Sequence, residues 1–220
     1  MALTQRPPHA MVHALLSRHG RTFAEDLHLD LGEDDASPPF RLLCFALLVS
    51  MKLHHHIALD AAEAMRQAGW TTPQRMADAG WRRRVRLLNR AGCARCDERA
   101  ATALGDLAHA LVADYTGDLR GLRDAADRDP ARERRLLEAL PGVMGPAVDV
   151  FFREVQIVWD ELYPYADRLA LRGADWLGLP ADASRLATLM DDRRQMVRFV
   201  AALVRMELEY DLEEVRRAAR

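Results

Sequence analysis

The stretch of sequence that decides the fold is "LLEALPGVMGPAVDVFFREV", residues 136–155. Two helix-like runs, Leu136–Leu140 and Ala147–Val155, are separated by Pro141-Gly142 and then by Gly145-Pro146. Proline ends a helix, and glycine permits the backbone conformations of a tight turn. A linker would be longer and more polar. The stretch therefore predicts a compact hairpin between two helices.

A hairpin of this kind exposes backbone N–H groups, and the helix that follows adds its own unpaired N–H groups and the positive end of its dipole. Together these groups can bind an anion without a basic side chain. We therefore expect the backbone of Gly142, Val143, Met144 and Gly145 to hold a phosphate, with Val143 and Met144 at the tip against an apolar sugar face. The alternative is an ordinary corner between two helices, which uses Gly and Pro for the same backbone reasons.

Helical periodicity continues through almost the whole chain of 220 residues, and no convincing alternating strand pattern occurs. Asp129-Pro130 is typical of a helix start, with Asp as the N-cap and Pro at the first helical position. The expected helices include Trp81–Ala91, Cys96–Tyr115 and one long C-terminal helix, Arg193–Arg217. The sequence predicts an all-α protein of short helices with short connections.

The composition fits a folded globular protein, with 50% hydrophobic and 29% charged residues. No apolar run approaches the roughly 20 residues that span a bilayer, and the first residues lack the apolar core of a signal peptide. We therefore expect a cytoplasmic protein. The three cysteines, Cys44, Cys93 and Cys96, are an odd number, and disulfides are not expected in a reducing compartment. The four tryptophans are expected mainly in the core.

The formal net charge of −2 does not by itself indicate a polyanionic partner. The stretch "RRRVRLLNRAGCARCDER", residues 82–99, nevertheless contains seven arginines against Asp97 and Glu98. A local basic patch can hold phosphates in a protein of neutral overall charge, which makes Arg82, Arg83 and Arg84 candidates for such contacts. The alternative is a solvated, arginine-rich helix face.

The hairpin and the segment "YADRLALRGADWLGLP" that follows it resemble the helix-hairpin-helix superfamily of base-excision DNA glycosylases, the endonuclease III-like group. The resemblance extends back through "GCARCDERAATALGDLAHAL" and "FRLLCFALLVSMK", and covers roughly residues 38–180. It implies a two-lobed helical fold with a DNA-binding cleft between the lobes. Residues 38–154 would form a central lobe that ends in the hairpin, and residues 1–37 with 155–220 would form the second lobe.

The resemblance also assigns roles to single residues. Asp167 stands where the family has the Asp that opens a helix after the hairpin, and it would stabilise the oxocarbenium-like sugar or orient water. Lys52, the single lysine against 30 arginines, would fill the gap left by a flipped base or contact a phosphate. The lysine nucleophile of the bifunctional members is missing, since Pro146 or Gly145 stands there. Met144 replaces the usual second glycine of the hairpin.

The resemblance therefore implies a monofunctional DNA N-glycosylase, without lyase activity, that excises a damaged or modified base from double-stranded DNA. No cofactor is expected, because the four-cysteine iron–sulfur cluster of many relatives cannot form from three cysteines. We expect a monomer, associated with the nucleoid.

Two alternatives belong to other classes. A catalytically silent member would recognise distorted or modified duplex DNA without cleaving it, and Asp167 would then serve only as a helix N-cap. A metal-dependent protein would use His54, His55 and His56. We do not expect a metal site, because consecutive residues on a helix point about 100° apart.

Overall fold

A computed structural model describes residues 8–32, 35–93 and 97–219. Throughout these ranges the secondary structure is helical, with turns and bends between the helices and no strand. This confirms the predicted all-α class. None of the helices described is both long enough and apolar enough to cross a membrane.

The chain divides into two compact units, and each contains its own core. Unit 1 combines residues 1–26 with residues 152–220, and unit 2 comprises residues 27–151. The central lobe expected over residues 38–154 therefore differs in both boundaries from unit 2, which begins at residue 27 and ends at residue 151. The second boundary lies inside helix α10 (Gly145–Val155), which continues from one unit into the other.

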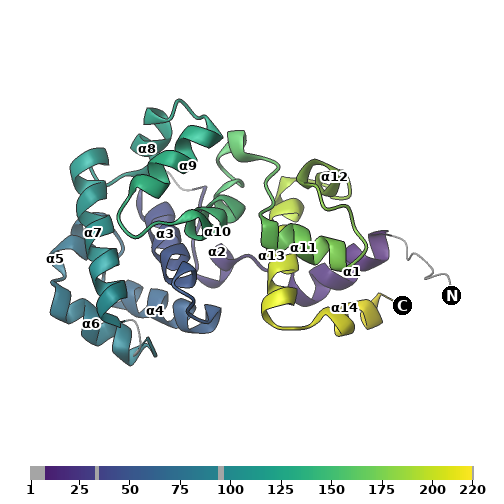
Figure 1. Cartoon of the computed structure of the whole chain (residues 1–220), viewed down its shortest axis with the longest axis horizontal. Coiled ribbons are helices and arrows are strands. Elements are labelled where there is room, and N and C mark those ends of the chain that lie inside the picture. The colour runs from purple at the N-terminus through teal and green to yellow at the C-terminus, as the bar shows by residue number, and fades with distance from the viewer. Residues whose placement is uncertain (1–7, 33–34, 94–96, 220) are drawn as a thin grey trace. The chain divides into compact units, whose positions relative to one another are not determined.

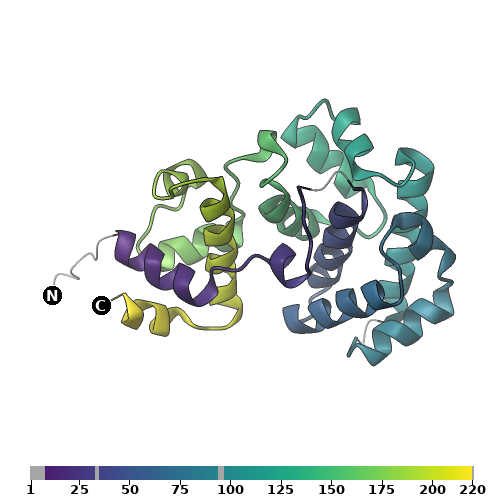
Figure 2. The ribbon, with the colours of Figure 1, turned by 180° about the vertical axis from the view of Figure 1, so that it is seen from behind.

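Unit 2 is built around helix α3, whose residues from Pro38 to Leu48 are almost all buried. Helix α7 packs against α5 and α6, and Figure 2 shows these helices from behind. The remaining helices close the unit. Their bounds are α3 (Ser37–Ser50), α4 (His55–Gln67), α5 (Pro73–Asp78), α6 (Trp81–Arg90), α7 (Asp97–Tyr115), α8 (Leu119–Ala125) and α9 (Pro130–Ala139).

The local signals for α9 act as the sequence predicts. Asp129 has an extended backbone, and its carboxylate accepts a hydrogen bond from the Arg132 N–H at 2.8 Å. Pro130 occupies the first helical position, where its missing N–H costs nothing. The start of α9 is thus fixed from its own sequence, and α9 leads directly into the hairpin.

Unit 1 is organised around α13, which contacts both α1 and α11 (Figure 1). Helices α11 and α13 approach closely at Gly173, where an added Cβ would lie 3.0 Å from the carbonyl oxygen of Leu203. The elements of unit 1 are α1 (Pro8–His19), α2 (Phe23–Asp26), the last turn of α10, η1 (Asp160–Leu162), α11 (Arg168–Trp176), α12 (Ala183–Ala187), α13 (Arg193–Leu208) and α14 (Leu212–Ala218).

The single C-terminal helix expected over Arg193–Arg217 was a wrong prediction. The chain turns between α13 and α14, where Tyr210 adopts a left-handed backbone conformation with φ of 56°. Asp211 follows, and its carboxylate accepts hydrogen bonds from Arg18 at 2.9 Å and from His19 at 2.8 Å. These contacts come from α1, more than 190 residues away in sequence, and helical periodicity alone cannot report them.

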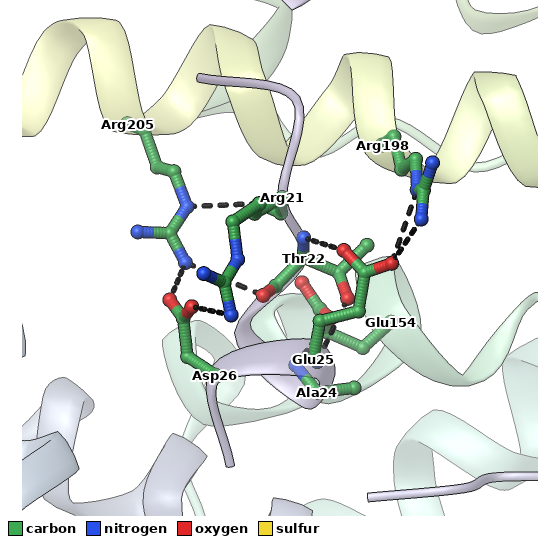
Figure 3. A network of polar contacts seen from close by, with 8 residues as sticks. All are labelled: Arg21, Thr22, Ala24, Glu25, Asp26, Glu154, Arg198 and Arg205. Atoms are coloured by element: carbon green, nitrogen blue, oxygen red, sulfur yellow. Dashed lines mark hydrogen bonds and ion pairs between the residues drawn. The ribbon is translucent and has the colours of Figure 1, made fainter. Parts of the chain in front are cut away.

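The short helix α2, which the sequence did not indicate, is held by a polar network (Figure 3). Thr22 and Glu25 form a reciprocal capping box: the Thr22 N–H donates to Glu25 at 2.9 Å, and the Glu25 N–H donates to the Thr22 hydroxyl at 3.0 Å. Arg198 and Arg205, two turns apart on α13, bind Glu25 and Asp26 respectively. Arg205 also donates to the Arg21 carbonyl at 2.9 Å.

Glu154 is the buried acid of this network, and it approaches α2 from α10 (Figure 3). Its Oε2 accepts a hydrogen bond from the Ala24 N–H at 3.0 Å, whereas Oε1 has no hydrogen-bond partner among the residues described. Burial raises the pKa of Glu154 above its ordinary value of 4.5, despite the backbone hydrogen bond and the nearby charge of Arg153. The folded state therefore holds the Glu154 proton more tightly than the unfolded chain does.

This raised pKa predicts a pH dependence of stability. Above about pH 4.5 the unfolded chain releases the Glu154 proton while the folded chain retains it, so the free energy of unfolding falls as the pH rises towards the folded pKa. Glu154→Gln keeps an oxygen acceptor for the Ala24 N–H and removes the titration. We expect the variant to gain stability relative to wild type as the pH rises above about 4.5, as measured by urea unfolding at each pH.

Glu25→Gln is the matched control, because it should show the opposite sign. Burial alone would raise the pKa of Glu25, but the hydrogen bonds from the Thr22 N–H and Arg198, together with the Arg198 charge, lower it overall. Its ionised form therefore stabilises the fold above the unfolded pKa, and this contribution is lost as the pH falls. Identical pH profiles for the two variants would contradict the assignment of Glu154.

Candidate nucleic-acid interface

The hairpin between α9 and α10 is a tight turn. Helix α9 ends at Ala139, and Leu140 turns to an extended conformation with φ −71° and ψ 140°. Gly142 has φ +77°, and the Val143 N–H donates to the Leu140 carbonyl at 3.1 Å. Gly142 also approaches α7 so closely that an added Cβ would lie 2.8 Å from the Cβ of Ala103. Both its conformation and its packing therefore require glycine.

The hairpin presents N–H groups that have no acceptor among the residues described. The amides of Gly142, Met144 and Gly145 make none of the backbone or side-chain hydrogen bonds found there, whereas the Met144 carbonyl accepts from the Ala147 N–H at 2.8 Å. Helix α10, which begins at Gly145, adds the positive end of its dipole. The arrangement is chemically suited to an anion.

The two side chains expected at the tip behave differently. Val143 is buried, so the prediction that its side chain faces a sugar was wrong: it packs into the core of unit 2. Met144 is 53% exposed and remains available for contact. Its backbone is not among those with positive φ, so methionine occupies the position of the usual glycine without conformational strain.

Lys52 and the hairpin line one open pocket of unit 2, with a volume of about 1260 Å³. Lys52 follows the C-terminal end of α3, and its exposed side chain lies on a backbone with φ of 64°. The structure thus brings together two features, Lys52 and the hairpin, that are about 90 residues apart in the sequence. The other lining residues are Ser50, Met51, Trp81, Asp97, Glu98, Arg99, Thr102, Ala103, Asp106 and Pro141.

The charge of this pocket is mixed. Lys52 and Arg99 are its cations, and Asp97, Glu98 and Asp106 are carboxylates presented by α7. A phosphate is therefore favoured at the hairpin and Lys52 but is repelled by the carboxylates of α7. The cations were expected from the sequence, whereas the carboxylates of α7 join the same pocket only in the folded chain.

The arginine patch is only partly available for phosphate contacts. Arg82 and Arg83 are exposed on α6, and the Arg83 guanidinium lies 5.8 Å from the centre of the Trp70 ring. Arg84 is 6% exposed and donates to the carbonyl oxygens of Ala101 and Met76, at 2.9 Å each. The prediction that Arg84 contacts DNA was therefore wrong. Burial lowers its pKa, and its side chain joins α6 to α5 and α7. Arg95 lies outside the residues described.

Asp167 belongs to unit 1, where it is the N-cap of α11. Its Oδ1 accepts hydrogen bonds from the N–H groups of Leu169 at 2.8 Å and Ala170 at 3.0 Å. Its Oδ2 accepts two more from the Nε and Nη2 atoms of Arg153. Asp167 is 5% exposed and Arg153 3% exposed. The cap role is therefore established, and both oxygens are occupied within the fold.

The sequence did not lead us to expect Arg153, the ion-pair partner of Asp167, at this site. The signal was present in "VFFREV", where Arg153 and Glu154 interrupt an apolar helical run. A charged residue in a buried helix requires a partner. Periodicity shows that the partner must exist, but it cannot show that the partner is Asp167, fourteen residues further along the chain.

The histidines do not follow the expected geometry. His54 precedes α4 with ψ of 137°, so the three residues are not consecutive on one helix, and their candidate ligand nitrogens lie within 4.8 Å of one another. The reason given for excluding a shared ion was therefore wrong. The rings of His54 and His55 are stacked, however, with centroids 4.6 Å apart. A metal ion lies in the plane of each imidazole that binds it, and two near-parallel stacked planes do not meet close to both rings.

Comparison of the chain with models of known protein families, with curated proteins and with solved structures found no match.

The contact between Arg84 and α7 yields a first prediction for this unit. At Gly105, an added Cβ would lie 2.2 Å from Nη2 of Arg84, whose guanidinium is held by two carbonyl oxygens. Gly105→Ala must displace this buried cation, and we expect the free energy of unfolding to fall by about 1–3 kcal/mol. Gly121→Ala is the control in α8, where the nearest atom is 3.6 Å away, and it should be neutral or stabilising in the same denaturation assay.

The ion pair of Asp167 yields a second prediction. Asp167→Asn retains an oxygen for the helix cap but leaves the Arg153 charge buried without a carboxylate, and we expect a loss of about 3–5 kcal/mol in the free energy of unfolding. Adding Arg153→Met should restore most of this loss, because the uncompensated charge is removed. The measurement is a double-mutant cycle by urea unfolding.

Asp182→Asn is the matched control for this cycle. Asp182 caps α12 at an exposed position, where it accepts from the Arg185 N–H at 2.8 Å, and exchange for Asn should change stability by less than about 0.5 kcal/mol. If Asp167→Asn lowers the free energy of unfolding equally little, the ion pair with Arg153 does not contribute to stability as proposed.

Proposed function

We propose that the protein binds duplex DNA that carries a damaged or modified base, with the hairpin of residues 140–145 on a phosphate. The observation that carries this proposal is the set of unbonded N–H groups of Gly142, Met144 and Gly145 at the start of α10. Lys52, which lines the adjoining pocket, adds a cation next to them. Backbone donors and a helix N-terminus bind phosphate without reading sequence, so they suit positioning of the duplex.

The geometry supports recognition without base release best. Excision of a base requires a carboxylate near the sugar C1′ that stabilises positive charge or activates water. Asp167 is buried, and its two oxygens already accept four hydrogen bonds, from Arg153, Leu169 and Ala170. The positive charge of Arg153 also repels the positive charge that would develop on the sugar beside this carboxylate. In the structure, Asp167 caps α11 and neutralises Arg153, which is a structural role.

A monofunctional DNA N-glycosylase is the second candidate. The observation in its favour is the place of Asp167 at the N-terminus of α11, where helix N–H groups keep an acceptor in a fixed position. For this candidate to hold, Arg153 must leave Oδ2 when DNA binds, so that the carboxylate can meet the sugar. Strand cleavage through a lysine next to the hairpin is not part of either candidate, because Pro146 or Gly145 stands at that position.

The deciding experiment measures binding and base release on the same duplexes, with uracil, oxidised, alkylated and hypermodified bases in turn. Recognition without excision predicts tighter binding to one damaged or modified duplex than to the undamaged one, with no free base by mass spectrometry and no break after alkali. An alkali-dependent break would establish the glycosylase instead. Equal binding to all duplexes, or none to any, would overturn the proposal.

Lys52→Ala tests the proposed phosphate contact. The variant should bind every duplex more weakly and reduce the slope of log affinity against log salt by about 1. Arg75→Ala is the control of equal charge change, since Arg75 is exposed on α5 and does not line the pocket. An equal loss for both variants would show only the effect of net charge.

A further inference from the structure

The pocket beside the hairpin contains an unusual share of the exposed apolar surface. Among the residues described, four large hydrophobic side chains are exposed: Trp81, Met144, Trp176 and Tyr210. Two of them, Trp81 and Met144, line this one pocket, although they come from α6 and from the hairpin. The expectation that the tryptophans are core residues fails for Trp81, which is 42% exposed.

The Trp81 ring is held in place. Its Nε1 donates a hydrogen bond to the Thr102 hydroxyl at 2.9 Å, and that hydroxyl donates to the Glu98 carbonyl at 2.9 Å. The polar edge of the indole is thus bound to α7, while part of the side chain remains open to the pocket. An indole ring that is held in place and partly exposed is suited to stacking against a planar ring, because little side-chain freedom is lost on binding.

Helix α7 supplies hydrogen-bond acceptors beside this ring. Glu98, Thr102 and Asp106 are spaced four residues apart, so they share one face of the helix, and all three line the pocket. Among the residues described, the carboxylates of Glu98 and Asp106 accept no hydrogen bond, although the charge of Asp106 acts on the buried Arg84 guanidinium. They are therefore available to accept hydrogen bonds from N–H groups of a ligand, and they repel phosphate.

These features divide the pocket chemically. The hairpin amides and Lys52 attract a phosphate, Trp81 and Met144 offer apolar contact, and α7 accepts from N–H donors. We infer that the pocket holds one unpaired nucleotide, with its phosphate at the hairpin, its base against Trp81 and its amino edge towards Glu98 and Asp106. The inference rests on the proposed function, since the nucleotide belongs to the bound DNA strand.

The same chemistry specifies the base. Cytosine, adenine and guanine carry an exocyclic amino group that can donate hydrogen bonds to a carboxylate, whereas thymine has no amino group and offers only its N3–H. A base stacked and paired within a duplex presents neither its face nor its pairing edge, so only an unpaired base gains from the pocket. The open pocket, with a volume of about 1260 Å³, is larger than typical small-molecule sites and offers enough space for a nucleotide.

The test compares the full chain and its Trp81→Ala variant on three labelled duplexes by fluorescence anisotropy: one fully paired, one with a single unpaired cytosine and one with a single unpaired thymine. We expect wild type to prefer the unpaired cytosine over paired DNA by about tenfold, and to gain less from thymine. Trp81→Ala should lose the preference and keep its affinity for paired DNA. Trp81→Phe, which restores an aromatic face, should recover most of it.

Trp176→Ala is the matched control, because Trp176 is similarly exposed, at 41%, but lies on α11 of the other unit. This substitution should leave the preference for the unpaired cytosine unchanged. Circular dichroism of each variant verifies that it is folded. Equal preference in wild type and folded Trp81→Ala, or no preference in wild type, overturns the inference while duplex binding by the hairpin still stands.

A fourth arm uses cytidine 5′-monophosphate alone, with tryptophan fluorescence as the readout. If no duplex binds but the mononucleotide quenches fluorescence in wild type and not in Trp81→Ala, the pocket takes free nucleotides and the proposed function fails. If neither duplex nor mononucleotide binds, both proposals are overturned.

Discussion

The close approach of Gly142 to α7 is the constraint on which the candidate interface depends. A side chain at this position would meet Ala103, and the left-handed backbone would strain any other residue. Because the turn lies directly on α7, the hairpin amides and the α7 carboxylates border the same pocket. One glycine therefore determines both the conformation of the anion site and the composition of the wall beside it.

The buried pair of Arg153 and Asp167 has a comparable role in unit 1, but its chemical effect is the reverse. The hairpin leaves donors open, whereas Asp167 has its acceptors filled by Arg153 and by the first amides of α11. A group satisfied inside the protein gains little from a ligand, and a group left unsatisfied at the surface gains much. This contrast is the physical reason for placing binding at the hairpin and assigning a structural role to Asp167.

Local signals in the sequence predicted the local structure well. The all-α class, the start of α9 at Asp129-Pro130 and the turn at Pro141-Gly142 each depend on neighbouring residues. The errors concern residues whose surroundings come from distant segments. Val143 and Arg84 are buried by contacts that the linear sequence does not encode in any motif, and α14 separates from α13 where Asp211 meets α1. The same holds for the pocket, where Trp81, Glu98 and Lys52 come from three separate segments.

The position of Lys52 has a practical consequence. The chain contains one lysine among 31 Lys and Arg residues, and that lysine is exposed and lines the pocket beside the hairpin. Among the side chains, a reagent that reacts with primary amines therefore has one target. A dye, a crosslinker or a spectroscopic probe can therefore be attached to this side chain, at the mouth of the pocket, without engineering a cysteine. The arginine-rich composition thus leaves the unmodified protein with a single side-chain amine, placed where it can report on whatever enters this pocket.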